Sequence, residues 1–131
     1  GAGKSTMARL WAGRSDVTLL SDERVVLRTD GDRILVYGTP WHGDARLTSP
    51  RCGELAGVFF LHHGSRHEIR PTGAPLAAAQ LFACAFLPFH SADAVGRTIV
   101  ALERVARDVP CRDLWFVPDD SVIGALDPCM R

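Results

Sequence analysis

The chain begins with a run that matches the second half of the phosphate-binding pattern G-x-x-x-x-G-K-[ST]: Gly1, Ala2, Gly3, Lys4, Ser5 and Thr6. In such a loop, backbone N–H groups surround the phosphates of a nucleotide, the lysine neutralises their charge and the hydroxyl binds Mg²⁺. Glycines are needed because the backbone turns through positive φ and comes close to the anion. The run therefore predicts a nucleotide site that leads into a helix, with all of these residues binding phosphate and Ser5 also binding the metal.

Lys4 is the only lysine among the 15 basic residues of the chain, and all the others are arginines. A compact ammonium group suits a phosphate, so the position of this lysine supports the phosphate-loop interpretation. The alternative is a helix N-terminus that matches the pattern by chance. The first glycine of the pattern and the strand that feeds the loop would precede residue 1. We therefore expect residues 1–131 to be a single domain that lacks its N-terminal strand.

Charge and hydropathy argue against two classes of partner. The formal net charge of zero gives no bulk attraction to nucleic acid or to an anionic membrane. No apolar run reaches membrane-spanning length and no signal peptide is visible, so we expect a cytoplasmic protein.

The four cysteines are Cys52, Cys84, Cys111 and Cys129, and no two of them form a C-x-x-C pair. Because an intracellular nucleotide enzyme works in a reducing environment, we expect four free thiols with structural roles. Cys84 lies beside two phenylalanines in an apolar helical pattern, so we expect its thiol to be in the core.

The apolar pattern predicts alternating helices and strands. Helices are expected from Lys4 to Ala12, at 75–86 and at 92–107, with a helical turn at 121–126. Strands are expected at 17–20, 25–27, 33–37, 57–61, 67–70 and 114–117, with a hairpin turn at Asp30-Gly31-Asp32 and a loop at 38–44. This order is typical of an α/β fold with a mixed sheet.

Asp22 and Glu23 follow the expected strand at 17–20 directly. Phosphoryl transfer needs carboxylates, both to hold the metal and to take the proton from the attacking hydroxyl. Since strand ends meet at the sheet edge that carries the phosphate loop, both residues are predicted to be catalytic and to bind metal. The alternative is a polar turn between two strands.

Histidines suggest two further sites. His42 lies in the glycine-flanked loop beside Trp41, where it could contact phosphate, although residue types alone favour a packed tryptophan corner. His62, His63 and His67 invite a zinc interpretation, but their spacing matches no compact ligand pattern. We keep His42 as a candidate catalytic residue.

Three segments together resemble the P-loop kinase domain of the HPr kinase/phosphorylase group, particularly its smaller relatives. These segments are Gly1–Thr6, Leu19–Leu27 and Tyr37–Asp44, and the ending at 109–119 extends the likeness over most of the chain. The smaller relatives include kinases encoded beside peptide-tailoring genes, some of which act on lasso-peptide precursors.

The resemblance implies the fold shared with ATP-dependent phosphoenolpyruvate carboxykinase, a mixed sheet with flanking helices. It implies transfer of the γ-phosphoryl of ATP, with Mg²⁺, to a serine of a protein or peptide, including a precursor peptide. The phosphate-loop roles fall on Gly3, Lys4, Ser5 and Thr6. The acidic pair, usually Asp-Asp in the group, falls on Asp22-Glu23, which makes Asp22 the candidate base and Glu23 a metal partner. The glycine-rich signature of true HPr kinases has no match, so HPr as substrate and phosphorylase activity are not expected.

Two other functions stay open from the sequence. One is a nucleotide-binding module without catalysis, such as a sensor or a pseudoenzyme. The other is a small-molecule kinase or a carboxykinase-like enzyme. An oligomer is compatible with the sequence.

Overall fold

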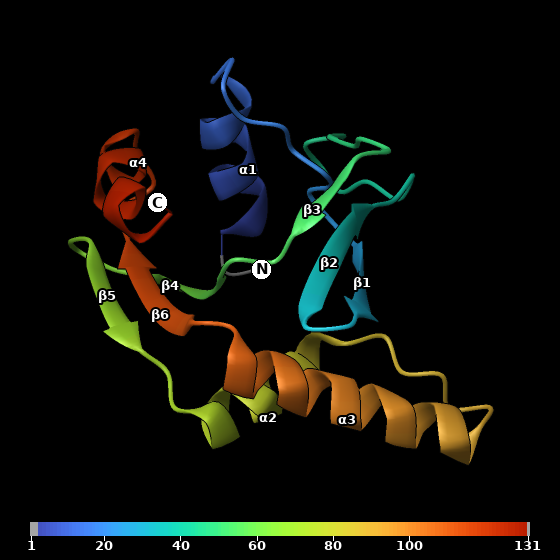
Figure 1. Ribbon diagram of the computed structural model, residues 1–131. Helices are drawn as coiled ribbons and strands as arrows, with labels where there is room; N and C mark the ends of the chain where they lie inside the picture. The colour runs from blue at the N-terminus through green and yellow to red at the C-terminus, as the bar shows by residue number, and fades with distance from the viewer. Residues whose placement is uncertain (1–2, 131) are drawn as a thin grey trace.

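Residues 3–130 are described by the computed structural model, and within them two three-stranded sheets and four α-helices form a mixed α/β fold (Figure 1). The α/β class expected from the sequence is therefore confirmed. The expected mixed sheet accounts for only three of the strands, because the hairpin strands and a third, short strand form an antiparallel sheet of their own.

The first sheet has the order β1-β2-β3 and is antiparallel throughout. Its strands are β1 (Val25–Asp30), β2 (Arg33–Gly38) and β3 (Cys52–Glu54). Gly31 begins the β1–β2 turn at φ 59°, a conformation that glycine adopts without steric strain and that suits a tight hairpin. The predicted hairpin is therefore confirmed. β3 was missed because three residues, one of them glycine, carry no apolar period.

The second sheet has the order β4-β6-β5. β4 (Val58–His63) runs parallel to β6 (Cys111–Phe116), and β5 (Glu68–Pro71) runs antiparallel to β6. Two helices cover each face: α1 (Lys4–Ala12) and α4 (Ser121–Leu126) on one, α2 (Ala74–Cys84) and α3 (Ala92–Asp108) on the other (Figure 1). A short 3₁₀ helix, η1 (Asp127–Cys129), follows α4.

Successive side chains of β6 point to opposite faces of its sheet, so β6 contributes to the core on both faces. Leu114 and Phe116 pack with Trp11 of α1 and Val122 of α4, whereas Cys111 packs on α2 and α3. Side chains of this size stabilise the fold by roughly 1.5–3 kcal/mol each when fully buried. Because Phe116 ends β6 on the α1 side, the core ties the start of α1 to the carboxyl end of this strand.

α3 joins the two sheets. Its N-terminus is capped by Ser91, whose Oγ accepts the Ala94 N–H at 3.2 Å. Near its C-terminus, Val105 and the following Val109 pack against Ile34 of β2. This contact fixes the antiparallel sheet beside the mixed one.

Two local predictions were wrong. Residues 17–20 form no strand; next to them a single bridge pairs Ser21 with Thr48, and the Leu20 carbonyl accepts the Ser49 N–H at 3.0 Å. Their apolar pattern instead reflects core packing, since Val17 and Leu19 contact the α1 side of the core. Cys84 is exposed because it lies in the last turn of α2, past the residues that pack on the sheet.

The four cysteines are free thiols, as predicted, and Cys111 is the buried one. Burial raises the pKa of the Cys111 thiol. Within residues 3–130, no helix combines the length and the apolar character needed to cross a membrane.

Candidate functional site

The start of α1 is built around Gly3. Its φ of 96° lies in the left-handed region, and a Cβ on Gly3 would lie 2.7 Å from Cζ of Phe116. Both the backbone conformation and the close approach therefore require glycine. The helix predicted from Lys4 to Ala12 is confirmed. Gly1 and Ala2, also predicted to bind phosphate, lie outside the described residues.

The first turn of α1 presents backbone donors. The Met7 N–H donates to the Gly3 carbonyl at 2.9 Å, so the N–H groups of Lys4, Ser5 and Thr6 have no acceptor within the helix. No side chain caps this end, and no acidic residue lies in the first turn. The positive end of the helix dipole adds to these donors, and Lys4 is exposed beside them. The arrangement fits a phosphate chain.

The start of α1 also lies at the carboxyl end of the parallel pair β4 and β6, through the contact of Gly3 with Phe116. In α/β sheets, ligands bind outside the carboxyl ends of the strands. The predicted phosphate residues are therefore at a position where this class of fold binds ligands.

The carboxylate of Asp22 binds the backbone of the loop that follows β2. Its side chain belongs to a residue only 7% exposed, and its carboxylate accepts the N–H groups of Gly43 at 2.9 Å, Ala45 at 2.7 Å and Leu47 at 3.2 Å. Desolvation pushes the pKa of Asp22 up, but these hydrogen bonds outweigh it and hold the pKa below its ordinary value. Both oxygens are engaged, so the carboxylate orders the loop at 43–47.

Glu23 and His42 line one open hollow of about 670 Å³, which we call the loop hollow. Its other lining residues are Arg24, Trp41, Gly43, Asp44 and Arg46. A Cβ on Gly43 would lie 3.0 Å from Oε2 of Glu23 and 3.1 Å from Oδ2 of Asp22. Glycine at this position therefore lets both predicted carboxylates approach the loop backbone.

Hydrogen bonds lock the turn at residues 21–24 to the loop that follows β2. Ser21 Oγ accepts the N–H groups of Glu23 and Arg24, both at 3.0 Å, and donates to the Trp41 carbonyl at 2.9 Å. Thr39 Oγ1 donates to the Arg24 carbonyl at 2.6 Å. The indole of Trp41 is not packed, since the residue is 60% exposed, so the tryptophan-corner interpretation was wrong.

Two features of the loop hollow are typical of a reactive site. His42 Nδ1 lies 3.1 Å from the Gly43 carbonyl. A carbonyl oxygen can only accept, so this contact favours the tautomer with the proton on Nδ1, in which Nε2 has the free lone pair. Arg46 has a φ of 53°, and among the described residues it is the one non-glycine residue in the left-handed region. Such conformations are concentrated at functional sites.

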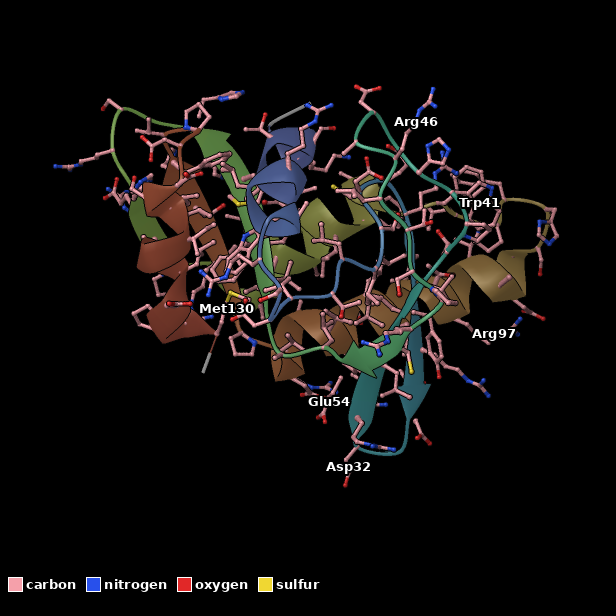
Figure 2. The ribbon with its side chains drawn as sticks, turned by 90° about the horizontal axis from the view of Figure 1, so that it is seen from above. Asp32, Trp41, Arg46, Glu54, Arg97 and Met130 are labelled. Carbon is pink, nitrogen blue, oxygen red and sulfur yellow. The ribbon has the colours of Figure 1, made fainter. Side chains whose placement is uncertain are left out.

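A second hollow, of about 680 Å³, lies between α1 and α4 and includes Thr6; we call it the interhelix hollow. It shares no lining residue with the loop hollow. Figure 2 shows Trp41 and Arg46 on one side of α1 and Met130, which follows α4 and η1, on the other. Two of the three predicted catalytic residues, Glu23 and His42, thus line the same hollow, while Thr6 of the phosphate loop lines a different one.

A third polar cluster was not predicted. Asp113 of β6 accepts Thr72 Oγ1 at 2.6 Å and pairs with Nε2 of His62 at 2.8 Å, and the His62 ring stacks on Trp115. Burial raises the pKa of Asp113, but the hydrogen bonds from Thr72 and His62 outweigh this effect, so the pKa lies below its ordinary value. The signal for this cluster was an aspartate directly before the apolar run at 114–117.

The histidines considered for zinc do not share a site. His62 pairs with Asp113, whereas His67 contacts Ser121 Oγ at 2.6 Å and accepts the Val117 N–H at 3.3 Å. Across residues 3–130, no group of three or more His, Cys, Asp or Glu side chains is arranged to hold a metal ion.

Compared with protein-family models, with curated proteins and with solved structures, the chain matched none.

Proposed function

We propose that this chain is an ATP-dependent serine kinase related to the HPr kinase/phosphorylase group. The β- and γ-phosphates of ATP bind the first-turn N–H groups of α1 and the ammonium of Lys4. The acceptor is a serine hydroxyl of a protein or peptide, and the fold is that of the carboxykinase-like P-loop enzymes. The protein works in the cytoplasm.

The observation that carries this proposal is the left-handed Gly3 immediately before the uncapped first turn of α1. A chance match to the pattern would not require glycine both for its φ of 96° and for its approach to Phe116. An anion at this position gains backbone hydrogen bonds, the helix dipole and a lysine together.

In the transfer step, the serine oxygen forms a bond to the γ-phosphorus and the bond from that phosphorus to the β–γ bridging oxygen breaks, releasing ADP. The serine proton passes to a base in the loop hollow. Asp22 fits this role less well than Glu23, because the Asp22 carboxylate already accepts three backbone N–H groups. We assign the base to Glu23, with Nε2 of His42 as the alternative acceptor.

Mg²⁺, when bound, would neutralise charge on the triphosphate. Ser5 is the hydroxyl in the first turn that would hold it, together with phosphate oxygens. Asp22 and Glu23 were the other predicted ligands; the Asp22 carboxylate is engaged in the loop, which leaves Glu23 as the carboxylate that could join Ser5.

The direct test measures ATP binding by calorimetry and γ-phosphate loss from ATP, with and without serine peptides. Lys4→Ala should weaken ATP binding by about 10–150-fold, since a charge-assisted contact contributes roughly 1.5–3 kcal/mol. Arg28→Ala, which removes an exposed basic residue of β1, should leave both measurements unchanged and is the matched control. Wild-type ATP binding in Lys4→Ala would rule out the phosphate-loop assignment.

The engaged carboxylate of Asp22 favours a second candidate, a nucleotide-binding module without catalysis. The same assays separate the two functions. A module would bind ATP with dependence on Lys4 but would not increase γ-phosphate loss with any peptide or small-molecule acceptor.

A further inference from the structure

The interhelix hollow begins at the phosphate loop, because Thr6 lines it and also belongs to the first turn of α1. We propose that this hollow holds the nucleoside of the ATP, the ribose and the purine base, while the phosphates lie at the start of α1. The inference rests on the proposed function and names where the uncharged part of the nucleotide binds.

One wall is a single face of α1. Thr6, Leu10 and Gly13 line the hollow at helical spacing, so they follow each other along the helix. With a rise of about 1.5 Å per residue, this face extends about 10 Å from Thr6. That length accommodates a ribose and a purine in line, starting at the position where the phosphates end.

The other wall is α4, which both views place beside α1 (Figure 1 and Figure 2). Ile123 and Gly124 face the hollow from this helix. Gly13 and Gly124 both line the hollow, and a Cβ on either would meet no atom within 4 Å, so there is space beside both positions. Leu10 and Ile123 supply the apolar surface that a flat base needs.

The charges of the hollow suit an uncharged group. Arg9 and Arg14 lie on the α1 wall, and Asp120 and Asp127 lie on the α4 wall, so the hollow has equal numbers of both signs. Arg14 is already paired with Asp16 at 3.1 Å. Walls with equal numbers of positive and negative side chains offer donors and acceptors to ribose hydroxyls and base edges. They do not have the net positive charge that a phosphate requires.

The test compares ATP with inorganic tripolyphosphate, which carries the phosphates but no nucleoside. In calorimetric titrations of the full chain at fixed salt and Mg²⁺, wild type should bind ATP about tenfold or more tightly than tripolyphosphate. Equal affinities of wild type for the two ligands would overturn the inference. If wild type binds neither ligand, the proposed function fails instead.

The second part of the test uses variants whose larger side chains fill the interhelix hollow. Gly124→Leu should weaken ATP binding by about tenfold or more and leave tripolyphosphate binding within about twofold. Gly13→Leu fills the same space from α1 and should act in the same direction. Gly96→Leu on α3 is the matched control, since a Cβ there also meets no atom within 4 Å. Folded Gly124→Leu and Gly13→Leu proteins that keep wild-type ATP affinity, or that lose both ligands equally, would overturn the inference.

Discussion

The start of α1 and the loop hollow are constructed in different ways. At the start of α1, one glycine and the helix that follows it create the site, so every donor comes from neighbouring residues. Beside the loop hollow, Asp22 accepts hydrogen bonds from N–H groups that are 21 to 25 residues away in the sequence. The first region depends on local backbone geometry, whereas the second depends on a buried carboxylate that holds a distant loop. Substitutions should therefore affect the two regions in different ways.

The largest expected effect distinguishes the two candidate proton acceptors of the loop hollow, Glu23 and His42. Glu23→Gln should lower γ-phosphoryl transfer by about 10²–10⁴-fold with little change in ATP affinity, because the variant keeps the shape but cannot accept a proton. His42→Gln should lower transfer by about tenfold, as expected for a group that assists. Single-turnover kinetics at saturating ATP provide the measurement.

The opposite ranking of these two variants would move the base to His42. Transfer that is unchanged in both, but abolished in Asp22→Asn with the loop still ordered, would return the base to Asp22, as the resemblance implies.

The next effect concerns Gly3. Gly3→Ala should lower the free energy of unfolding by about 2–4 kcal/mol, because alanine is strained at φ 96° and its Cβ would clash with Phe116. Gly31→Ala is the control, since Gly31 also has a positive φ of 59° but a Cβ there meets no atom within 4 Å. It should lower stability by only about 1–2 kcal/mol. Denaturant unfolding measures both values, and equal effects would mean that the ring of Phe116 moves away without cost.

The difference between the regions also explains which features the sequence could predict. α1, the hairpin and the helix at 121–126 follow from local signals: a glycine before a helix, a glycine turn and apolar spacing. The role of Asp22 could not be predicted, because its partners are backbone N–H groups of a loop without any periodic pattern. Likewise, an apolar run at 17–20 looks the same whether it forms a strand or packs as a loop onto the core.

A smaller effect should be confined to the loop. Asp22→Asn exchanges an acceptor-only carboxylate for an amide whose NH₂ group opposes a backbone donor. The amide protons of Gly43, Ala45 and Leu47 should therefore exchange at least about tenfold faster, while ATP affinity changes by no more than about threefold. Hydrogen exchange followed by NMR measures the loop, with the Leu114 amide of β6 as the internal control. Unchanged protection would show that the loop is ordered without Asp22.

The smallest effect is the acid response of the same loop. The pKa of Asp22 in the folded protein lies below its ordinary value, since the three backbone hydrogen bonds outweigh desolvation. The stability that Asp22 gives the loop is therefore complete above the unfolded pKa, near about 4, and is lost as the pH falls through the lower folded pKa.

Because Asp113 also has a lowered pKa, a global unfolding curve would report both carboxylates together, so the measurement must follow the loop alone. The amide shifts of Gly43 and Ala45 should titrate with a midpoint below about 3.9. This titration should disappear in Asp22→Asn and persist in Asp113→Asn. A midpoint at or above about 3.9 would mean that desolvation dominates, and Asp22 would then regain its place as a candidate proton acceptor.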